Sequence, residues 1–305
     1  MDSPELPVHA GVSPAASRPS GTAEVPKDAD RPPTAPRRTP IWLLALGVGI
    51  LAGGLAGLGG EVTNRAFPVW VVHPKGNVVA RSTEETGVLS FPVRADLPPE
   101  FDSLDGYVRT GARSVILKRG LRVAEGYKAA AAFGLVAALL GIGLGLTGGL
   151  ARGTGRSGLF GALLGGLGGL ATAVALALLL VPLFFRLQDS AESAQFQNPD
   201  APSSLFLLLV ATHAGISAGI GAVVGLGLGL GLGERRRIAG AVLGGLAGGC
   251  VGAFASDAIN SLAYPLMRTY VPVAEEPIPR VLALFCVAVA TALFAGWAAG
   301  DPRRR

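Results

Sequence analysis

The chain has 305 residues and a formal net charge of +5, and 50% of its residues are hydrophobic while only 15% are charged. An average soluble domain carries about 25% charged residues, so this composition argues against an ordinary soluble enzyme. Glycine occupies 45 positions without a Gly-X-Y period, and most of these glycines lie inside apolar runs. Together these features indicate a multi-pass membrane protein.

The basic residues flank the apolar runs and do not form one stripe. This distribution is typical of residues that set membrane topology and not of a surface that binds nucleic acid phosphates. We therefore expect the lipid bilayer as a partner and no nucleic acid. Cys250 and Cys286 both lie in apolar runs. Without a CxxC motif or a histidine cluster, they predict no metal site.

The first 60 residues divide into a tail and a membrane span. Residues 1–40 contain nine prolines and no apolar periodicity, which predicts a disordered cytoplasmic tail. Residues 41–60 are uncharged over 20 positions, long enough to cross the hydrocarbon core as a helix. A cleaved signal peptide is the alternative, but the preceding region is long and no A-x-A site follows. We predict a membrane anchor.

Five further runs contain no Asp, Glu, Lys or Arg, and their lengths suit transmembrane helices. These runs span residues 129–150, 158–185, 204–232, 238–256 and 281–300. The predicted fold class is an all-α integral membrane protein with a six-helix bundle. Residues 61–128 form a separate segment between the first two spans, and residues 301–305 form a basic C-terminus.

Arginines gather in the short segments that a six-span topology places on one side of the membrane. They are Arg37, Arg38, Arg152, Arg156, Arg235, Arg236, Arg237, Arg303, Arg304 and Arg305. The short loops on the other side, residues 186–203 and 257–280, mix arginine with acidic residues. The positive-inside rule then places both termini in the cytoplasm and residues 61–128 outside it. We predict a bacterial inner (cytoplasmic) membrane protein.

The extracytoplasmic segment is expected to contain some β-structure. Residues 67–72 and 77–81 read as a hairpin, and residues 88–93 as a third strand. Residues 111–128 read as a helix continuous with the second span. About 68 residues give a marginal core, so we expect this segment to rest on the membrane surface or on a partner.

Two stretches of the chain resemble each other closely enough to predict a duplicated helical hairpin. Residues 161–169 reappear as residues 240–248, an offset of 79 residues. The match continues on both sides. Residues 141–146 resemble 225–230, and residues 182–186 resemble 265–268. Repeats of the same orientation are related by an axis along the membrane normal. The alternative is coincidence within Gly/Leu/Ala-rich sequence.

Within the predicted spans, glycines recur at four-residue steps, which places each row on one face of a helix. The rows comprise Gly49, Gly53, Gly57, Gly141, Gly145, Gly161, Gly165, Gly169, Gly221, Gly225, Gly229, Gly240, Gly244 and Gly248. Such rows let helices approach closely in lipid, as in a glycine zipper. Either every row packs against a helix of the same chain, or a row at Gly53 or Gly296 faces another protomer. Possible partners are a second copy or another membrane protein.

Two ionisable residues stand out in the predicted spans. His213 lies well inside one, and Asp257 lies at the outer end of the next. Intramembrane ionisable groups are functional candidates by default. The alternative for His213 is a neutral ring bonded to a carbonyl or to Thr212. Their depths differ, so a direct contact requires a tilted helix. We find no pattern for a catalytic residue, a cofactor or a metal ion.

The stretch from Gly134 to Gly141, which leads into Leu146 to Arg152, resembles hairpins of Gly-rich bacterial multi-pass membrane proteins of no known activity. The resemblance covers the second to fifth spans and implies no activity. We expect a non-enzymatic integral membrane protein that is structural or binds a partner. The alternative is an uncoupled small-solute transporter or channel, since charged residues that would support coupling are absent from the spans.

Overall fold

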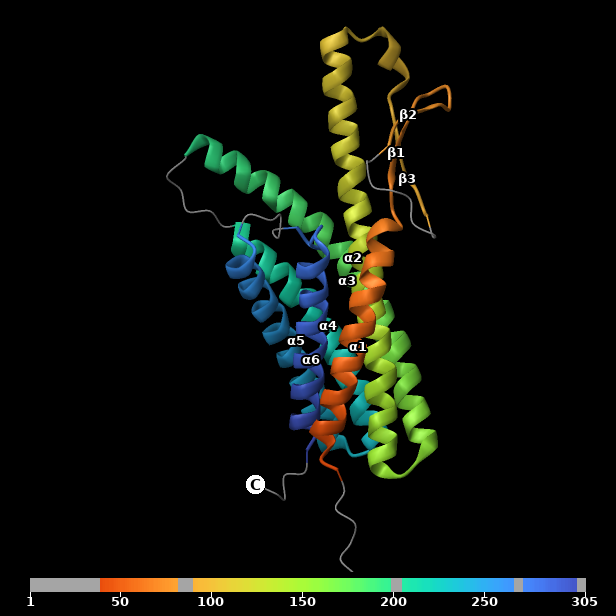
Figure 1. The fold of residues 1–305 in the computed structure, drawn as a ribbon, viewed down its shortest axis with the longest axis vertical. Coiled ribbons are helices and arrows are strands. Elements are labelled where there is room, and N and C mark those ends of the chain that lie inside the picture. Colours follow the sequence, from red (N-terminus) through yellow and green to blue (C-terminus); the bar gives the residue numbers. More distant parts are fainter. Residues whose placement is uncertain (1–38, 82–89, 199–204, 266–270, 301–305) are drawn as a thin grey trace, which may run out of the picture. The chain divides into compact units, whose positions relative to one another are not determined.

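The computed structural model describes residues 39–81, 90–198, 205–265 and 271–300. The predictions for the tail before residue 39, for residues 266–268 and for the C-terminal arginines lie outside these ranges. Within them, six helices are long and apolar enough to cross a membrane. They are α1 (Ile41–Arg65), α2 (Gly106–Arg152), α3 (Gly155–Gln197), α4 (Leu205–Leu232), α5 (Arg235–Ala263) and α6 (Pro277–Ala298) (Figure 1). The expectation of a helical multi-pass membrane protein is confirmed.

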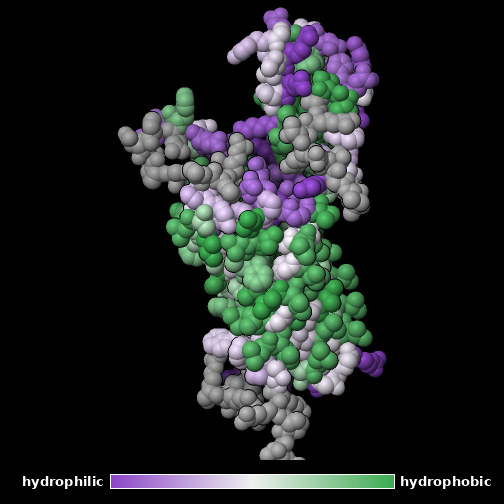
Figure 2. Space-filling view, viewed as in Figure 1, coloured by the Kyte–Doolittle hydropathy of each residue, from purple (hydrophilic) through white to green (hydrophobic). Residues whose placement is uncertain are grey.

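Two helices are much longer than their predicted spans. The 47 residues of α2 measure about 70 Å at 1.5 Å per residue, more than twice the thickness of a hydrocarbon core. We call residues 106–128 the α2 extension, which confirms the expected helix at 111–128. The 43-residue helix α3 likewise runs past residue 185. On the face shown in Figure 2, hydrophobic residues cover the bundle, and hydrophilic residues gather beyond them, around the sheet and the α2 extension. Arg122 in the α2 extension donates to Asp189 of α3 at 2.6 Å.

The helices pack in a closed cycle. Helix α1 contacts α6, α6 contacts α5, and the contacts continue through α4, α3 and α2 back to α1. Helix α4 also packs on α2, so these two helices supply the centre, with Leu140, Leu144, Ile216, Ile220 and Leu228 fully buried. The turns after α2 and α4, the start of α1 and the end of α6 gather at one end of the bundle (Figure 1).

A three-stranded sheet follows α1. Its strands β1 (Val69–Val72), β2 (Val78–Arg81) and β3 (Val93–Asp96) lie in the order β2-β1-β3. The predicted hairpin is formed, because β1 and β2 are antiparallel and Gly76 adopts a positive φ of 87° in the turn. The third strand was predicted at residues 88–93, but it lies at Val93–Asp96, where it pairs in parallel with β1.

The sheet rests on the α2 extension of its own chain. Val71 of β1 packs with Phe101, which lies in the short 3-10 helix η1 (Pro99–Ser103), and with Ile116 and Leu117 of α2. At Gly120, an added Cβ would lie 2.7 Å from Val69, so only glycine lets β1 come this close. Helix α2 therefore supplies the second layer of the small core of this segment. The expectation that the segment also rests on the membrane or on a partner stays a prediction.

The turn after β1 is held to η1 by a contact that depends on pH. His73 Nε2 and Lys75 Nζ lie 2.8 Å and 3.2 Å from the carboxylate of Asp102. The His73 hydrogen bond, and then that of Lys75, hold the pKa of Asp102 below its ordinary value of 3.8. The folded carboxyl therefore has a lower pKa than the unfolded one, so its stabilisation is present above 3.8 and is lost as the pH falls through the lowered value.

We expect the exchange protection of the amides of residues 73–77 to persist from neutral pH down to about pH 4 and to fall below it. The measurement is hydrogen exchange on the full chain, corrected for the intrinsic pH dependence. The variant Asp102→Asn should show the reduced protection already at neutral pH. Equal protection in D102N and the wild type at neutral pH would contradict this assignment.

Candidate functional site

His213 and Asp257 meet inside the bundle. His213 Nδ1 lies 2.7 Å from Asp257 Oδ1, and both residues are buried, at 8% and 4% exposure. Asp257 was expected near the outer end of its helix, and the helix extends further beyond it than predicted. Helix α5 continues to Ala263, so Asp257 lies six residues inside it. Helices α4 and α5 pack antiparallel, so His213, eight residues after the start of α4, and Asp257, six residues before the end of α5, lie at a similar height.

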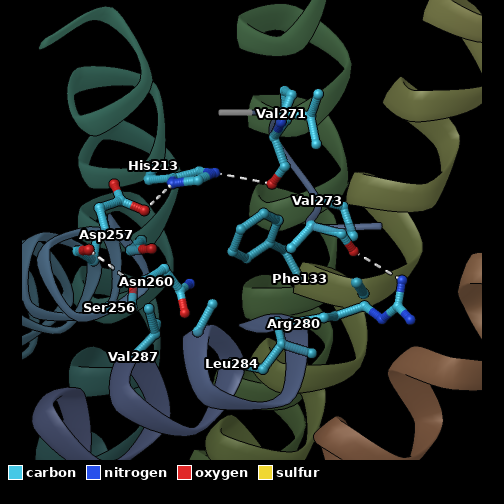
Figure 3. A pocket seen from close by; sticks show the side chains of 16 residues that line it. Phe133, His213, Ser256, Asp257, Asn260, Val271, Val273, Arg280, Leu284 and Val287 are labelled. Atoms are coloured by element: carbon cyan, nitrogen blue, oxygen red, sulfur yellow. Dashed lines mark hydrogen bonds and ion pairs between the residues drawn. The ribbon is translucent and has the colours of Figure 1, made fainter. Parts of the chain in front are cut away.

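The second ring nitrogen of His213 is bonded to the segment that follows α5. His213 Nε2 lies 2.9 Å from the carbonyl oxygen of Pro272 (Figure 3). The expectation of a carbonyl partner is therefore confirmed, but Thr212 is not a partner, since its hydroxyl donates to the Leu208 carbonyl at 2.8 Å. A carbonyl oxygen can only accept, so Nε2 carries a hydrogen. The ring thus links α4, α5 and residues 271–274.

A cavity of about 30 Å³ adjoins the pair; we call it the polar cavity. Helices α2, α4, α5 and α6 and residues 271–274 line it, and Phe133, Leu284 and Val287 form much of its apolar wall (Figure 3). Its polar lining comprises His213, Ser217, Ser256, Asp257, Asn260 and Arg280. A water molecule needs roughly 10–15 Å³ of such space, so one or two waters fit.

Three polar atoms at the polar cavity have no hydrogen-bond partner among the described residues. They are Asp257 Oδ2, Asn260 Oδ1 and Ser217 Oγ. Their residues are all at least 95% buried. Leaving a buried polar atom unpaired costs about 1–3 kcal/mol, so such atoms are normally bonded to protein or to ordered water. The lining of the polar cavity therefore suits water or another small polar species.

Arg280 is a buried residue that sequence reasoning missed. Its exposure is 2%, and its guanidinium donates to Glu61 Oε1 at 2.8 Å and to the Ala274 carbonyl at 2.9 Å. Glu61 lies one residue after the predicted span 41–60, and Arg280 lies one residue before the predicted span 281–300. Both were therefore interpreted as charges in loops. The pair forms because α1 packs beside α6, and nothing in the spacing of the two residues indicates this neighbour relation.

All the predicted row glycines lie against a helix of the same chain. At each of the fourteen, an added Cβ would come within 3.1 Å of a neighbouring helix. The row on α1 faces α6, where Gly53 meets Phe285 and Ala288, and Gly296 of α6 meets Trp42 and Ala45 of α1. Gly53 and Gly296 therefore pack between α1 and α6 of one chain. The expectation of a second copy or another membrane protein as a partner stays a prediction.

The described residues include no group of three or more His, Cys, Asp or Glu side chains that could hold a metal ion. The chain matches no protein-family model, no curated protein and no solved structure. The fold places it in a class, that of α-helical proteins with six candidate membrane spans.

Proposed function

We propose that this chain is a non-enzymatic multi-pass membrane protein that acts as a rigid anchor. In this proposal, the anchor holds the α2 extension and its sheet on the extracytoplasmic side for contact with another membrane protein. The observation that carries it is the continuity of α2, which runs as one helix from beneath the sheet into the centre of the bundle. A load on the sheet is therefore transmitted to the bundle without an intervening loop.

Glycine-zipper packing and a duplicated hairpin would give such an anchor its stiffness. The closest backbone approaches between α2 and α3 recur between α4 and α5, 80 residues further along the chain. The first hairpin pairs Gly141 with Gly165 and Gly145 with the Gly161–Ala162 peptide, and the second pairs Gly221 with Gly245 and Gly225 with the Ala241–Val242 peptide. This spacing supports duplication and differs by one residue from the 79-residue offset of the sequence match.

The α2 extension offers a surface suited to a partner. Tyr107 and Val115 are 92% and 67% exposed, although they lie beyond the apolar part of the helix. The basic residues Arg109, Arg113, Lys118 and Arg119 lie on the same extension. Exposed apolar side chains among basic ones favour a partner surface that is partly apolar and acidic.

Site-specific photo-crosslinking in the native cells tests the partner surface. A photoreactive residue at position 107 or 115 should give a discrete protein adduct, while the same residue at Leu51, an exposed position on the apolar part of α1, should label lipid. The adduct should disappear when Val115 is replaced by Glu in the chain labelled at 107. If positions 107 and 115 label only lipid or water, the partner-binding proposal is wrong.

An uncoupled transporter or channel is the second candidate, and the polar cavity inside the bundle favours it. With a volume of about 30 Å³, the cavity admits water or a small ion and no larger solute. In reconstituted liposomes, the anchor predicts no ion leak above that of empty vesicles. A leak that changes with His213→Ala would instead support the channel.

A further inference from the structure

We propose that His213 and Asp257 form a buried proton-binding site, which exchanges its proton through water in the polar cavity. The proton holds residues 271–274 against α4. This inference concerns the interior of the bundle and does not depend on the proposed partner surface.

The proton follows from the two hydrogen bonds of the ring. His213 Nε2 faces a carbonyl oxygen, so this nitrogen carries a hydrogen. His213 Nδ1 faces Asp257 Oδ1 at 2.7 Å, a distance typical of a hydrogen bond. One proton must therefore lie between these atoms, either on Nδ1 as part of an imidazolium or on Asp257 as a carboxylic acid. Without it, two lone pairs would face each other.

In the part of the chain that the structure describes, no unbalanced charge beside the pair stabilises its deprotonated form. Among the described residues that line the polar cavity, α6 contributes the cation Arg280, whose charge is balanced by Glu61 of α1. Helix α2 contributes Ala132 and Phe133, and residues 271–274 contribute no ionisable side chain. With its proton, the pair has no net charge. Without it, one buried negative charge remains uncompensated, which is strongly unfavourable at this depth.

Water in the polar cavity can accept the proton from the His213–Asp257 pair. Asp257 Oδ2, Asn260 Oδ1 and Ser217 Oγ are buried, unpartnered and part of the cavity wall, so they can hold one or two waters. In the release step, the N–H or O–H bond of the shared proton breaks and its electron pair stays on the His213–Asp257 pair. The proton bonds to a cavity water as hydronium, and the pair changes from net charge zero to −1.

Release of the proton also loosens the segment after α5. His213 is the residue whose side chain bonds the Pro272 carbonyl, and its ring orientation is set by the bond to Asp257. When the two lone pairs repel, the ring turns away and the Pro272 bond is lost with it. Among the described side-chain hydrogen bonds, only that of Arg280 to the Ala274 carbonyl then retains residues 271–274, together with the packing of Val273 in the core.

Nitrogen-15 NMR of the full chain in detergent tests the proton directly. The chain has three histidines, so the variants His9→Gln and His73→Gln assign His213 by elimination. At neutral pH we expect a hydrogen on Nε2, together with either a hydrogen on Nδ1 or an infrared carboxylic acid band that is absent from Asp257→Asn. Finding neither the Nδ1 hydrogen nor the acid band in the wild type would overturn the proposal.

The control is the exposed His73–Asp102 pair. Asp102→Asn should leave the His213 signals unchanged. In the wild type, these signals should change in one step as the pH rises and the pair releases its proton, and Asp257→Asn should abolish this step. If the step survives in D257N, Asp257 does not share the proton and the proposal is wrong. If D257N fails to fold, the wild-type spectra decide the question alone.

Hydrogen exchange at Val273 and Ala274 tests the release of the segment. Once the pH exceeds that at which the pair releases its proton, we expect exchange to accelerate by about tenfold beyond its intrinsic pH dependence, because the hydrogen bond from His213 to the Pro272 carbonyl is lost. Exchange that follows the intrinsic dependence through the step would overturn the link between the proton and this segment.

Discussion

Replacing Gly141 by alanine is expected to destabilise the bundle by roughly 3 kcal/mol, the upper part of the usual range for an overpacked core. At this position an added Cβ would overlap the backbone of Gly165 and Gly166. Backbone atoms cannot rotate away as the end of a side chain can. Helices α2 and α3 must therefore move apart along their whole contact, which loses the close packing that holds helices together in lipid.

The measurement is the free energy of unfolding in detergent by steric trapping. Gly54→Ala is the matched control, because Gly54 lies in a span with nothing within 4 Å of an added Cβ. There, alanine should be neutral or stabilise by up to about 1 kcal/mol, since it favours the helix. Gly221→Ala, at the corresponding position of the second hairpin, should cost as much as G141A. Equal stabilities of G141A and G54A would refute the glycine-mediated packing.

The second large effect is expected for Glu61→Gln, which keeps the shape of the side chain and removes its charge. Arg280 is 2% exposed and would lose its only described carboxylate partner. Breaking a buried ion pair on one side costs about 3–5 kcal/mol. Because Glu61 is itself 32% exposed, we expect about 3 kcal/mol, the lower end of this range.

The same unfolding assay, applied to the exposed pair Arg94–Asp96, gives the comparison. Its side chains are 66% and 61% exposed, so Asp96→Asn should cost less than about 1 kcal/mol. The double variant Glu61→Gln with Arg280→Met should recover part of the loss, since it removes the unpaired charge. A cost for E61Q as small as that for D96N would show that Arg280 does not depend on Glu61.

Much of the fold follows from the sequence because lipid allows few alternatives. Hydrogen bonds of a backbone in lipid must be satisfied internally, so long uncharged runs become helices. The predicted run at 204–232 corresponds closely to α4 (Leu205–Leu232). The ends of the helices are harder to predict from the sequence, because the length of a helix beyond the lipid depends on what packs against it. Helix α2 thus begins at Gly106 and not at the edge of the apolar run, because the sheet packs on its residues Ala112, Ile116, Leu117 and Gly120.

The sequence indicated two residues of the candidate site and missed the others. His213 and Asp257 were singled out because ionisable residues are rare in apolar runs, yet their contact was expected only with a tilted helix. Asn260 and Arg280 gave no signal, since both fall at the ends of predicted spans, where polar residues are ordinary. Ser217 lies inside a predicted span, but a single serine there is no signal of a site. What unites these residues is the packing of α4, α5 and α6, which brings positions up to 67 residues apart to one cavity.

The sequence by itself determined the class of this protein, its six apolar helices and the glycine rows, because hydrophobicity and helical period are local properties of the chain. The tertiary structure decided the partners: α6 for the glycine row of α1, the α2 extension for the sheet, Asp257 for His213 and Glu61 for Arg280. Partner choice depends on which faces of the helices fit together, and this is a property of the whole bundle.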